Sequence, residues 1–129
     1  MNVVERFVDA VNRGDVDGIT ACFHPRFEMI VPQHPRRGFV GRDQEVKNMR
    51  LLVESHPEGR IAIRRMVESA GEVWVQNGYH ADGLHIEAVV IYEIDQATDT
   101  IRVGYYYSEE VDDGGPDIDE WMENLGAPS

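Results

Sequence analysis

The chain has 129 residues, with 24 acidic and 12 basic side chains and a formal net charge of −12. Eight of the acids follow Arg102, after which no Lys or Arg occurs, so the acidity belongs to the C-terminal tail. This distribution argues against nucleic acid and anionic membrane surfaces as partners, because both are bound through clustered Lys and Arg. The length predicts one domain over residues 1–111, followed by an acidic tail over residues 112–129.

The cysteine content and the N-terminal sequence indicate a cytoplasmic protein. Cys22 is the only cysteine, so no disulfide forms within the chain and we expect a reducing compartment. The first twenty residues already contain six charged side chains, which argues against a secretory signal peptide. No apolar run approaches the roughly 20 residues that are needed to span a bilayer.

Two helices separated by a tight break are predicted near the N-terminus. The first has an apolar stripe with helical spacing, formed by Val3, Val4, Phe7, Val8 and Val11. Gly14 fits the left-handed residue that ends a helix, and Asp15 is a suitable N-cap for the next one. The second helix continues the apolar face through Val16, Ile19, Cys22 and Phe23. Pro25 is expected to end it, and a strand is expected to follow, up to Pro32.

A third helix and four strands follow. Asp43 is the expected N-cap of the helix, Pro57 closes it, and its apolar stripe consists of Val46, Met49, Leu52 and Val53. From Arg60 onward the period changes to two, which predicts strands at residues 60–69, 72–80, 84–94 and 100–109. Asp82-Gly83 is a strong two-residue hairpin signal. Because no helix separates these strands, we expect an antiparallel meander.

Three N-terminal helices followed by such a meander predict an α+β, cone-shaped domain, in which the helices pack on a curled, mostly antiparallel sheet and enclose a pocket. The opening FVDAVNRGDVDGI of residues 7–19, then Phe23 and the GFVG of residues 38–41, resembles that of ketosteroid isomerases and SnoaL-like polyketide cyclases. Both groups belong to the nuclear-transport-factor-like superfamily. The resemblance covers residues 3–110, and this superfamily is functionally broad.

The Asp82-Gly83 turn fixes which side chains of its hairpin share a face. It pairs His80 with His85, and the same register pairs Asn77 with Ala88. One face therefore consists of Val73, Val75, Asn77, Tyr79, Ile86, Ala88, Val90 and Tyr92. Because the opposite face carries the charged residues, we expect this first set to face the pocket.

The resemblance also implies three catalytic positions, and all of them are apolar here. Ketosteroid isomerases use an Asp as general base, with a Tyr and a protonated Asp as oxyanion donors. The aligned positions are Val31, Phe7 and Val90, and none of them can transfer a proton. Steroid isomerisation by that mechanism is therefore not expected. Glu28 would replace the base only if a bulge turned it inward, because its neighbours occupy the core-facing phase.

The expected ligand site combines apolar side chains with an amide and several phenols. Asn77 is a lone amide on an apolar face and needs a partner, either a ligand or a neighbouring backbone or Tyr hydroxyl group. In the last strand, charged Arg102 between apolar Ile101 and Val103 favours an inward direction for Tyr105 and Tyr107. The complete predicted set is Phe7, Met29, Val31, His34, Met49, Asn77, Tyr79, Val90, Tyr92, Tyr105 and Tyr107.

Two other clusters of polar residues can be interpreted in more than one way. A basic loop at the expected pocket mouth, with His34, Arg36 and Arg37, either receives a ligand carboxylate or phosphate or is simply solvated. His80, His85 and Glu87 have the chemistry of metal ligands, but they belong to the outer face of the hairpin. We therefore predict no metal site and no cofactor.

The sequence thus predicts a SnoaL-like protein that binds a small hydrophobic or aromatic molecule in a largely apolar pocket, with no reaction assigned. The alternative is an acid–base enzyme of the cyclase, dehydratase or hydrolase type, using Glu28 or a Tyr/His combination. A third reading is an associative module that uses its sheet as an interface. The enzyme requires an ionisable cavity group with a shifted pKa, whereas binding requires only shape and an orienting polar group.

The outer face of the hairpin predicts self-association. Trp74, Gln76, Val89 and Ile91 do not form the polar surface of a sheet that only meets water, and aromatic residues with a polar rim are typical of interfaces. Ketosteroid isomerases dimerise through this face, so the resemblance implies a homodimer that buries Trp74 and Ile91. The competing arrangement has the tail, with Trp121 and Met122, cover the face within one chain.

Overall fold

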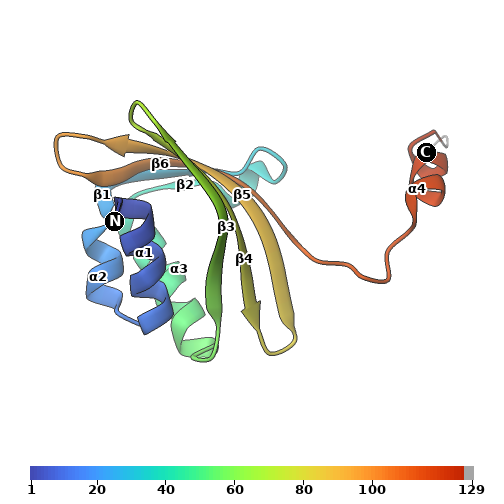
Figure 1. The fold of residues 1–129 in the computed structure, drawn as a ribbon, viewed down its shortest axis with the longest axis horizontal. Coiled ribbons are helices and arrows are strands. Elements are labelled where there is room, and N and C mark those ends of the chain that lie inside the picture. The colour runs from blue at the N-terminus through green and yellow to red at the C-terminus, as the bar shows by residue number, and fades with distance from the viewer. Residues whose placement is uncertain (127–129) are drawn as a thin grey trace.

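In the computed structural model, which describes residues 1–126, three helices lie against one face of a six-strand sheet and a fourth helix stands apart (Figure 1). The last three residues of the predicted tail lie outside the described residues. The helices are α1 (Val3–Arg13), α2 (Val16–Ala21), α3 (Arg42–Ser55) and α4 (Ile118–Gly126), with a 3-10 turn η1 at Pro35–Arg37. The strands are β1 (Phe23–Ile30), β2 (Phe39–Val40), β3 (Arg60–Ser69), β4 (Glu72–Ala81), β5 (Leu84–Asp95) and β6 (Thr100–Glu110).

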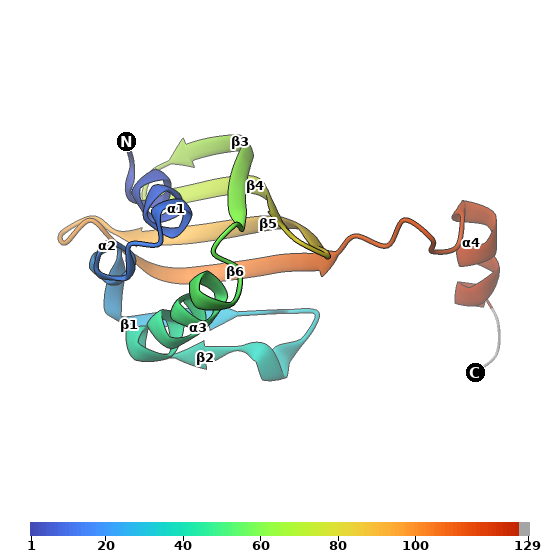
Figure 2. The same ribbon diagram turned by 90° about the horizontal axis from the view of Figure 1, so that it is seen from below.

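The sheet has the order β2-β1-β6-β5-β4-β3. β1 runs parallel to β6, and every other neighbouring pair is antiparallel. This arrangement confirms the predicted α+β class and the mostly antiparallel sheet. Figure 2 shows α1, α2 and α3 side by side across the sheet face that they cover.

The N-terminal helices form for the local reasons that the sequence indicates. Asn2 caps α1 in a capping box with Glu5, and Gly14 ends the helix at φ 68°. The Asp15 side chain then accepts a hydrogen bond from the Gly18 backbone N–H at the start of α2. The predicted roles of Gly14 and Asp15 are confirmed.

Two predicted helix boundaries are wrong. α2 ends at Ala21, and Phe23 already begins β1, so Pro25 lies inside a strand rather than terminating a helix. A proline is tolerated there because β1 makes no regular pairing with β6 between Phe23 and Glu28. At α3 the N-cap is Gly41, at φ 117°, and Asp43 lies in the first turn instead of capping it.

An edge-to-face series of aromatic rings forms the centre of the core. The ring centroids of Phe7 and Phe23 are 5.0 Å apart, and those of Phe23 and Phe27 are 4.7 Å apart. Phe39 extends the series from β2 at 6.1 Å from Phe27. Because these rings come from α1, β1 and β2, the series fixes the first helix and the first two strands to one another.

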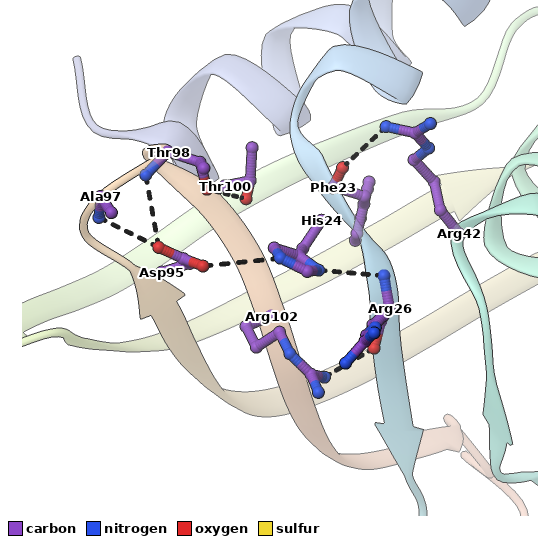
Figure 3. Close-up of polar contacts among 9 residues, drawn as sticks. All are labelled: Phe23, His24, Arg26, Arg42, Asp95, Ala97, Thr98, Thr100 and Arg102. Carbon is purple, nitrogen blue, oxygen red and sulfur yellow. Dashed lines mark hydrogen bonds and ion pairs between the residues drawn. The ribbon is translucent and has the colours of Figure 1, made fainter.

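Two irregular strand segments face each other where β1 meets β6 (Figure 3). The β5–β6 register shifts so that Glu93 pairs with Val103 while Ile94 pairs with Ile101, which leaves Arg102 as a bulge residue. The Arg102 guanidinium donates to the Arg26 carbonyl oxygen over 2.6 Å, inside the unpaired part of β1. The two bulges are therefore bridged by one side chain.

The same region is held to the β5–β6 turn by a carboxylate (Figure 3). Asp95 accepts hydrogen bonds from the backbone N–H groups of Ala97 and Thr98, and its other oxygen lies 3.5 Å from His24 Nε2. His24 Nδ1 in turn accepts a hydrogen bond from the Arg26 backbone N–H. These contacts satisfy backbone groups that the irregular strand leaves without ladder partners.

The Arg102 bulge reverses the inward and outward alternation of β6, and the predicted phase of its tyrosines is wrong. Tyr106 pairs with Val90 and points to the helices, while Tyr105 pairs with Ile91 and Tyr107 with Val89 on the outer face. Strict alternation counted from Ile101 predicts the wrong face, because one extra residue shifts every later side chain to the other side of the sheet. By contrast, the predicted β4–β5 register is confirmed at every pair, from His80 with His85 to Val73 with Tyr92.

The C-terminal helix α4 projects away from the sheet (Figures 1 and 2). Its apolar stripe is exposed, with Ile118 66%, Trp121 49%, Met122 54% and Leu125 62% accessible. Up to residue 126, the tail therefore does not cover the outer sheet face. Within residues 1–126, no helix combines the length and the apolar character that a membrane crossing requires.

Candidate functional site

A cavity of about 170 Å³ lies between the helices and the sheet. It receives side chains from α1, α3 and five strands, and most of them are apolar. The lining consists of Phe7, Val8, Met29, Glu45, Met49, Leu52, Ile61, Asn77, Tyr79, Ile86, Ala88, Val90, Tyr92, Tyr106 and Ser108. A cavity of ~150 Å³ lined by apolar groups holds a benzene molecule, so this one has room for a single ring with a short substituent.

The structure brings seven of the predicted site residues together around this cavity: Phe7, Met29, Met49, Asn77, Tyr79, Val90 and Tyr92. Four others lie elsewhere. Val31 is buried near β2, beside a separate hollow, and His34 Nε2 donates a hydrogen bond to the Glu109 carboxylate at the surface. Tyr105 and Tyr107 point to the outer face because of the β6 bulge.

Glu45 is a charged cavity residue that was not predicted from the sequence. Its side chain is only 1% exposed, and its Oε2 atom is buried without a hydrogen-bond partner among residues 1–126. Burial raises the pKa of this carboxyl to about 7, because transfer out of water disfavours the charged form. The spacing could have revealed it, since Glu45 precedes Met49 by four residues and Leu52 by seven, on the stripe that faces the sheet.

Two phenols lie near Glu45. The Tyr106 hydroxyl donates to the Tyr92 hydroxyl over 3.4 Å, and the two rings meet edge to face at a centroid distance of 5.8 Å. Burial raises the pKa of both phenols, and the negative charge of Glu45 adds to the effect. Gly104, opposite Tyr92, leaves the space for this packing, because a Cβ atom there would lie 2.5 Å from the Tyr106 ring.

The amide of Asn77 faces the cavity without a protein partner. It pairs with Ala88 in the sheet and lines the cavity, and within residues 1–126 its side chain makes no hydrogen bond. The predicted alternative, a bond to a neighbouring backbone or Tyr hydroxyl group, is therefore not found. Tyr79, two residues further along β4, packs its phenol against Gly59, where any Cβ atom would collide with it.

Glu28, the base considered for an acid–base enzyme, does not line this cavity. It pairs with Val103, whose partner in β5 is the outward-facing Glu93. The charge of Glu93 raises the pKa of Tyr105 on the outer face, and the charge of Glu28 adds a smaller contribution. The bulge in β1 therefore does not turn Glu28 toward the cavity.

The basic loop lies near a neighbouring hollow of about 410 Å³ that shares Ile86 and Ser108 with the cavity. Arg37 lines this hollow together with Glu109 and Glu110. The loop thus contributes one cation to a region that also holds two carboxylates.

The His80, His85 and Glu87 group forms on the outer face, with its ligand atoms within 4.8 Å of one another. The Glu87 carboxylate already receives two hydrogen bonds from Arg64, at 2.7 and 2.6 Å, and lies 2.6 Å from His85 Nε2. The hydrogen bonding of Arg64, and to a smaller extent that of His85, lowers the pKa of Glu87 to about 2. A metal ion would have to displace a bidentate guanidinium, so the group is explained as an ion-pair network.

A larger hollow, of about 470 Å³, lies at the opposite end of the molecule. It is formed mainly by the β3–β4 turn and its neighbours, including Ser69, Gly71 and Asp99. Because many of its lining residues belong to exposed turns, volume alone does not make it the better candidate. The smaller cavity combines an apolar wall with an unpartnered amide and carboxyl.

The family comparison is consistent with this architecture. Residues 4–103 match the model of the SnoaL-like domain. The chain belongs to the SnoaL-like domain family. A solved structure described as an NTF2-like protein, from Cytophaga hutchinsonii, has the same fold, with a TM-score of 0.67, 16% identity and coverages of 83% of this chain and 87% of that chain. A search of curated protein sequences finds no match.

Solved structures with the same fold differ widely in origin. A candidate ketosteroid isomerase from Kribbella flavida has a TM-score of 0.71 and 13% identity, with 89% of this chain and 81% of that chain covered. A candidate SnoaL-like polyketide cyclase from Shewanella denitrificans has a TM-score of 0.70 and 12% identity, with coverages of 96% and 94%. A de novo designed protein with a curved sheet has a TM-score of 0.66 and 21% identity, with coverages of 95% and 93%. These likenesses establish the fold, and they do not assign an activity.

Proposed function

We propose that this SnoaL-like protein binds a small, largely apolar or aromatic molecule in the cavity between α3 and the sheet. The observation that supports the proposal is the amide of half-buried Asn77, which lines a mostly apolar cavity and makes no side-chain hydrogen bond within residues 1–126. A polar group in such surroundings is normally hydrogen-bonded, so the amide is available to orient a ligand. The volume of about 170 Å³ favours a ligand with one ring.

The test compares two amides on opposite faces of β4. Asn77→Leu should abolish binding of 2-phenylethanol, a one-ring probe with a hydroxyl group, and leave the circular dichroism spectrum unchanged. Gln76→Leu is the matched control, because Gln76 pairs with Val89 on the outer face. Affinity is measured by calorimetry and saturation-transfer NMR. Unchanged affinity in Asn77→Leu would remove Asn77 from the site.

Acid–base catalysis is the second candidate, and Glu45 is the observation that favours it. A buried carboxyl with a pKa near the working pH is suited to proton transfer. The generic assay is exchange of the methyl protons of acetophenone for deuterium in D2O, followed by NMR. Exchange that is lost in Glu45→Gln and retained in Glu54→Gln, at an exposed position, would support acid–base catalysis. Exchange at the buffer rate would reject this reaction class for small aryl ketones.

We also propose that the outer sheet face pairs with a second copy of the chain. The face exposes Trp74, Val89 and Tyr107, at 49%, 43% and 40%, and α4 leaves it uncovered in this structure (Figure 1).

A reducing, cytoplasmic location is proposed on the basis of the single buried cysteine, Cys22. Fractionation of the producing cells tests the location, and recovery outside the cytoplasm would contradict it.

A further inference from the structure

Glu45 is a buried acid without the positive partner that such groups normally have. Charged side chains are almost never fully buried unless they are paired. Here the side chain is 1% exposed and its Oε2 atom has no hydrogen-bond partner in the described part of the chain. Burial alone raises the pKa of this carboxyl, and no nearby cation contributes to the shift.

Basic side chains lie outside the lining of the cavity that contains Glu45. Among residues 1–126, the cavity lining includes no Lys, Arg or His. Arg42, on the same helix, donates to the Phe23 carbonyl oxygen. The titratable groups that line the cavity with Glu45 are the phenols of Tyr79, Tyr92 and Tyr106, and burial raises the pKa of each.

The remaining features of the cavity suit an organic cation. Four aromatic rings line it, those of Phe7, Tyr79, Tyr92 and Tyr106, and aromatic faces attract ammonium groups. Glu45 also lies in the first turn of α3, where the helix dipole favours a negative charge.

We propose that the cavity selects a small protonated amine with a ring-sized apolar body, and that the ligand nitrogen pairs with the carboxylate of Glu45. This inference rests on the proposed binding function and names the chemical class of its ligand. The ammonium group supplies the charge and the N–H donors that Glu45 lacks, while the ring occupies the apolar part of the cavity. Glu45 is thus the residue that determines ligand class.

The experiment compares two probes of nearly equal shape. 2-Phenylethylamine is a cation near neutral pH, and 2-phenylethanol is its uncharged counterpart. Each is titrated by calorimetry into the full chain at pH 6 and at pH 8, in two buffers of different ionisation enthalpy. The variants are Glu45→Gln, which keeps the shape and removes the charge, and Glu54→Gln, which removes an exposed carboxylate from the same helix.

We expect the amine to bind at least tenfold more tightly than the alcohol at pH 8. Its affinity should rise about tenfold from pH 6 to pH 8, since a carboxyl with a pKa of about 7 is then converted from mostly protonated to mostly ionised. At pH 6 binding should release a proton, which the two buffers detect. Glu45→Gln should lose the preference for the amine, and Glu54→Gln should retain it.

Each contrary result has a distinct meaning. Tighter binding of the alcohol, with affinity that falls as the pH rises, would show that a protonated Glu45 donates to an oxygen ligand; it would overturn the amine class while supporting the cavity as a binding site. Retained amine preference in Glu45→Gln would also overturn the inference. The wild-type comparison decides the question even if Glu45→Gln does not fold. Binding of neither probe up to millimolar concentration would reject the proposed function itself.

Discussion

Glu45 occupies the sheet-facing stripe of α3 together with Met49 and Leu52, and its position follows from helical spacing alone. The charged residue type disguises that position, because acids are ordinarily exposed. The tertiary structure reveals it, since the covering sheet and α1 exclude water from the carboxyl. Its buried state has a measurable consequence for stability.

Replacement of Glu45 by Gln should make folding stability less dependent on pH. The folded-state pKa of about 7 exceeds the ordinary value of 4.5, so the folded protein binds this proton more tightly than the unfolded chain. The favourable contribution is present below about pH 4.5 and is lost as the pH rises to about 7 and above, by about 3 kcal/mol in total. Urea denaturation of both proteins at pH 4 and pH 8 measures this difference.

The variant should therefore gain about 3 kcal/mol relative to the wild type between those two pH values. Glu54→Gln, at an exposed position of α3, is the control and should show no comparable change. A constant difference between the wild type and Glu45→Gln across the pH range would show that the carboxyl is not desolvated in solution.

A second prediction at this scale concerns steroid chemistry. Phe7 and Val90 line the cavity where the resemblance implies a Tyr and an Asp, and Val31 lies outside the lining. The cavity of about 170 Å³ is also too small for a four-ring substrate. We expect no turnover of Δ5-3-ketosteroids above the buffer rate, measured by ultraviolet absorbance of the conjugated product. Turnover well above that rate would contradict the assignment of these positions.

Among the elements, β6 shows how one residue reorganises a strand. Arg102 is displaced into a bulge and is anchored on the Arg26 carbonyl oxygen. Beyond this point Gly104 and Tyr106 lie on the inner face of the sheet, and Tyr105 and Tyr107 lie on the outer face. The cavity therefore contains Tyr106 and its contact with Tyr92 instead of the two tyrosines that simple alternation predicts.

Gly104→Ala should test this phase. The added Cβ atom would lie 2.5 Å from the Tyr106 ring, so the ring must move and the variant should lose about 1–3 kcal/mol of stability through overpacking. Gly114→Ala is the matched control, because its nearest neighbour is 4.0 Å from the added atom. Thermal denaturation of both variants measures the effect. A neutral or stabilising Gly104→Ala would indicate that Tyr106 is not packed over this position.

At the scale of the whole molecule, the outer sheet face and the α4 stripe are both apolar and both exposed. The extended segment of residues 111–117 separates α4 from the sheet in this structure (Figure 2). Exposed aromatic residues surrounded by polar groups are typical of interfaces. The proposed homodimer therefore has a defined surface to test.

We expect light scattering coupled to size exclusion to give twice the chain mass of 14.7 kDa at micromolar protein concentration. Ile91→Glu should shift the protein to the monomer mass, since it places a charge at the centre of the proposed interface beside Trp74. Glu68→Gln, on an exposed part of β3, is a control that should leave the mass unchanged. A wild-type monomer would reject the pairing, and a dimer that survives Ile91→Glu would move the interface to another face.

Local signals in the sequence were sufficient for the helical opening and the β4–β5 hairpin. Gly14 and Asp15 specify a break by backbone conformation and capping, and Asp82-Gly83 specifies a register that sets every pair between Val73 and Tyr92. Such features depend on neighbours within a few residues. For the same reason Asn77, Tyr79 and Val90 were placed correctly on the inner face.

The tertiary structure alone decided which tyrosine of β6 enters the cavity and how completely Glu45 is buried. The β6 bulge places the Arg102 guanidinium on the carbonyl oxygen of Arg26, 76 residues earlier in the chain, and it exchanged Tyr105 and Tyr107 for Tyr106. The burial of Glu45 arises because sheet and helices close over one face of α3. By itself the sequence determined the elements and most of the cavity wall, because periodicity and turn chemistry are local. Helical spacing places Glu45 on the inner stripe of α3, but the desolvation of its carboxyl depends on long-range packing, which no local pattern encodes.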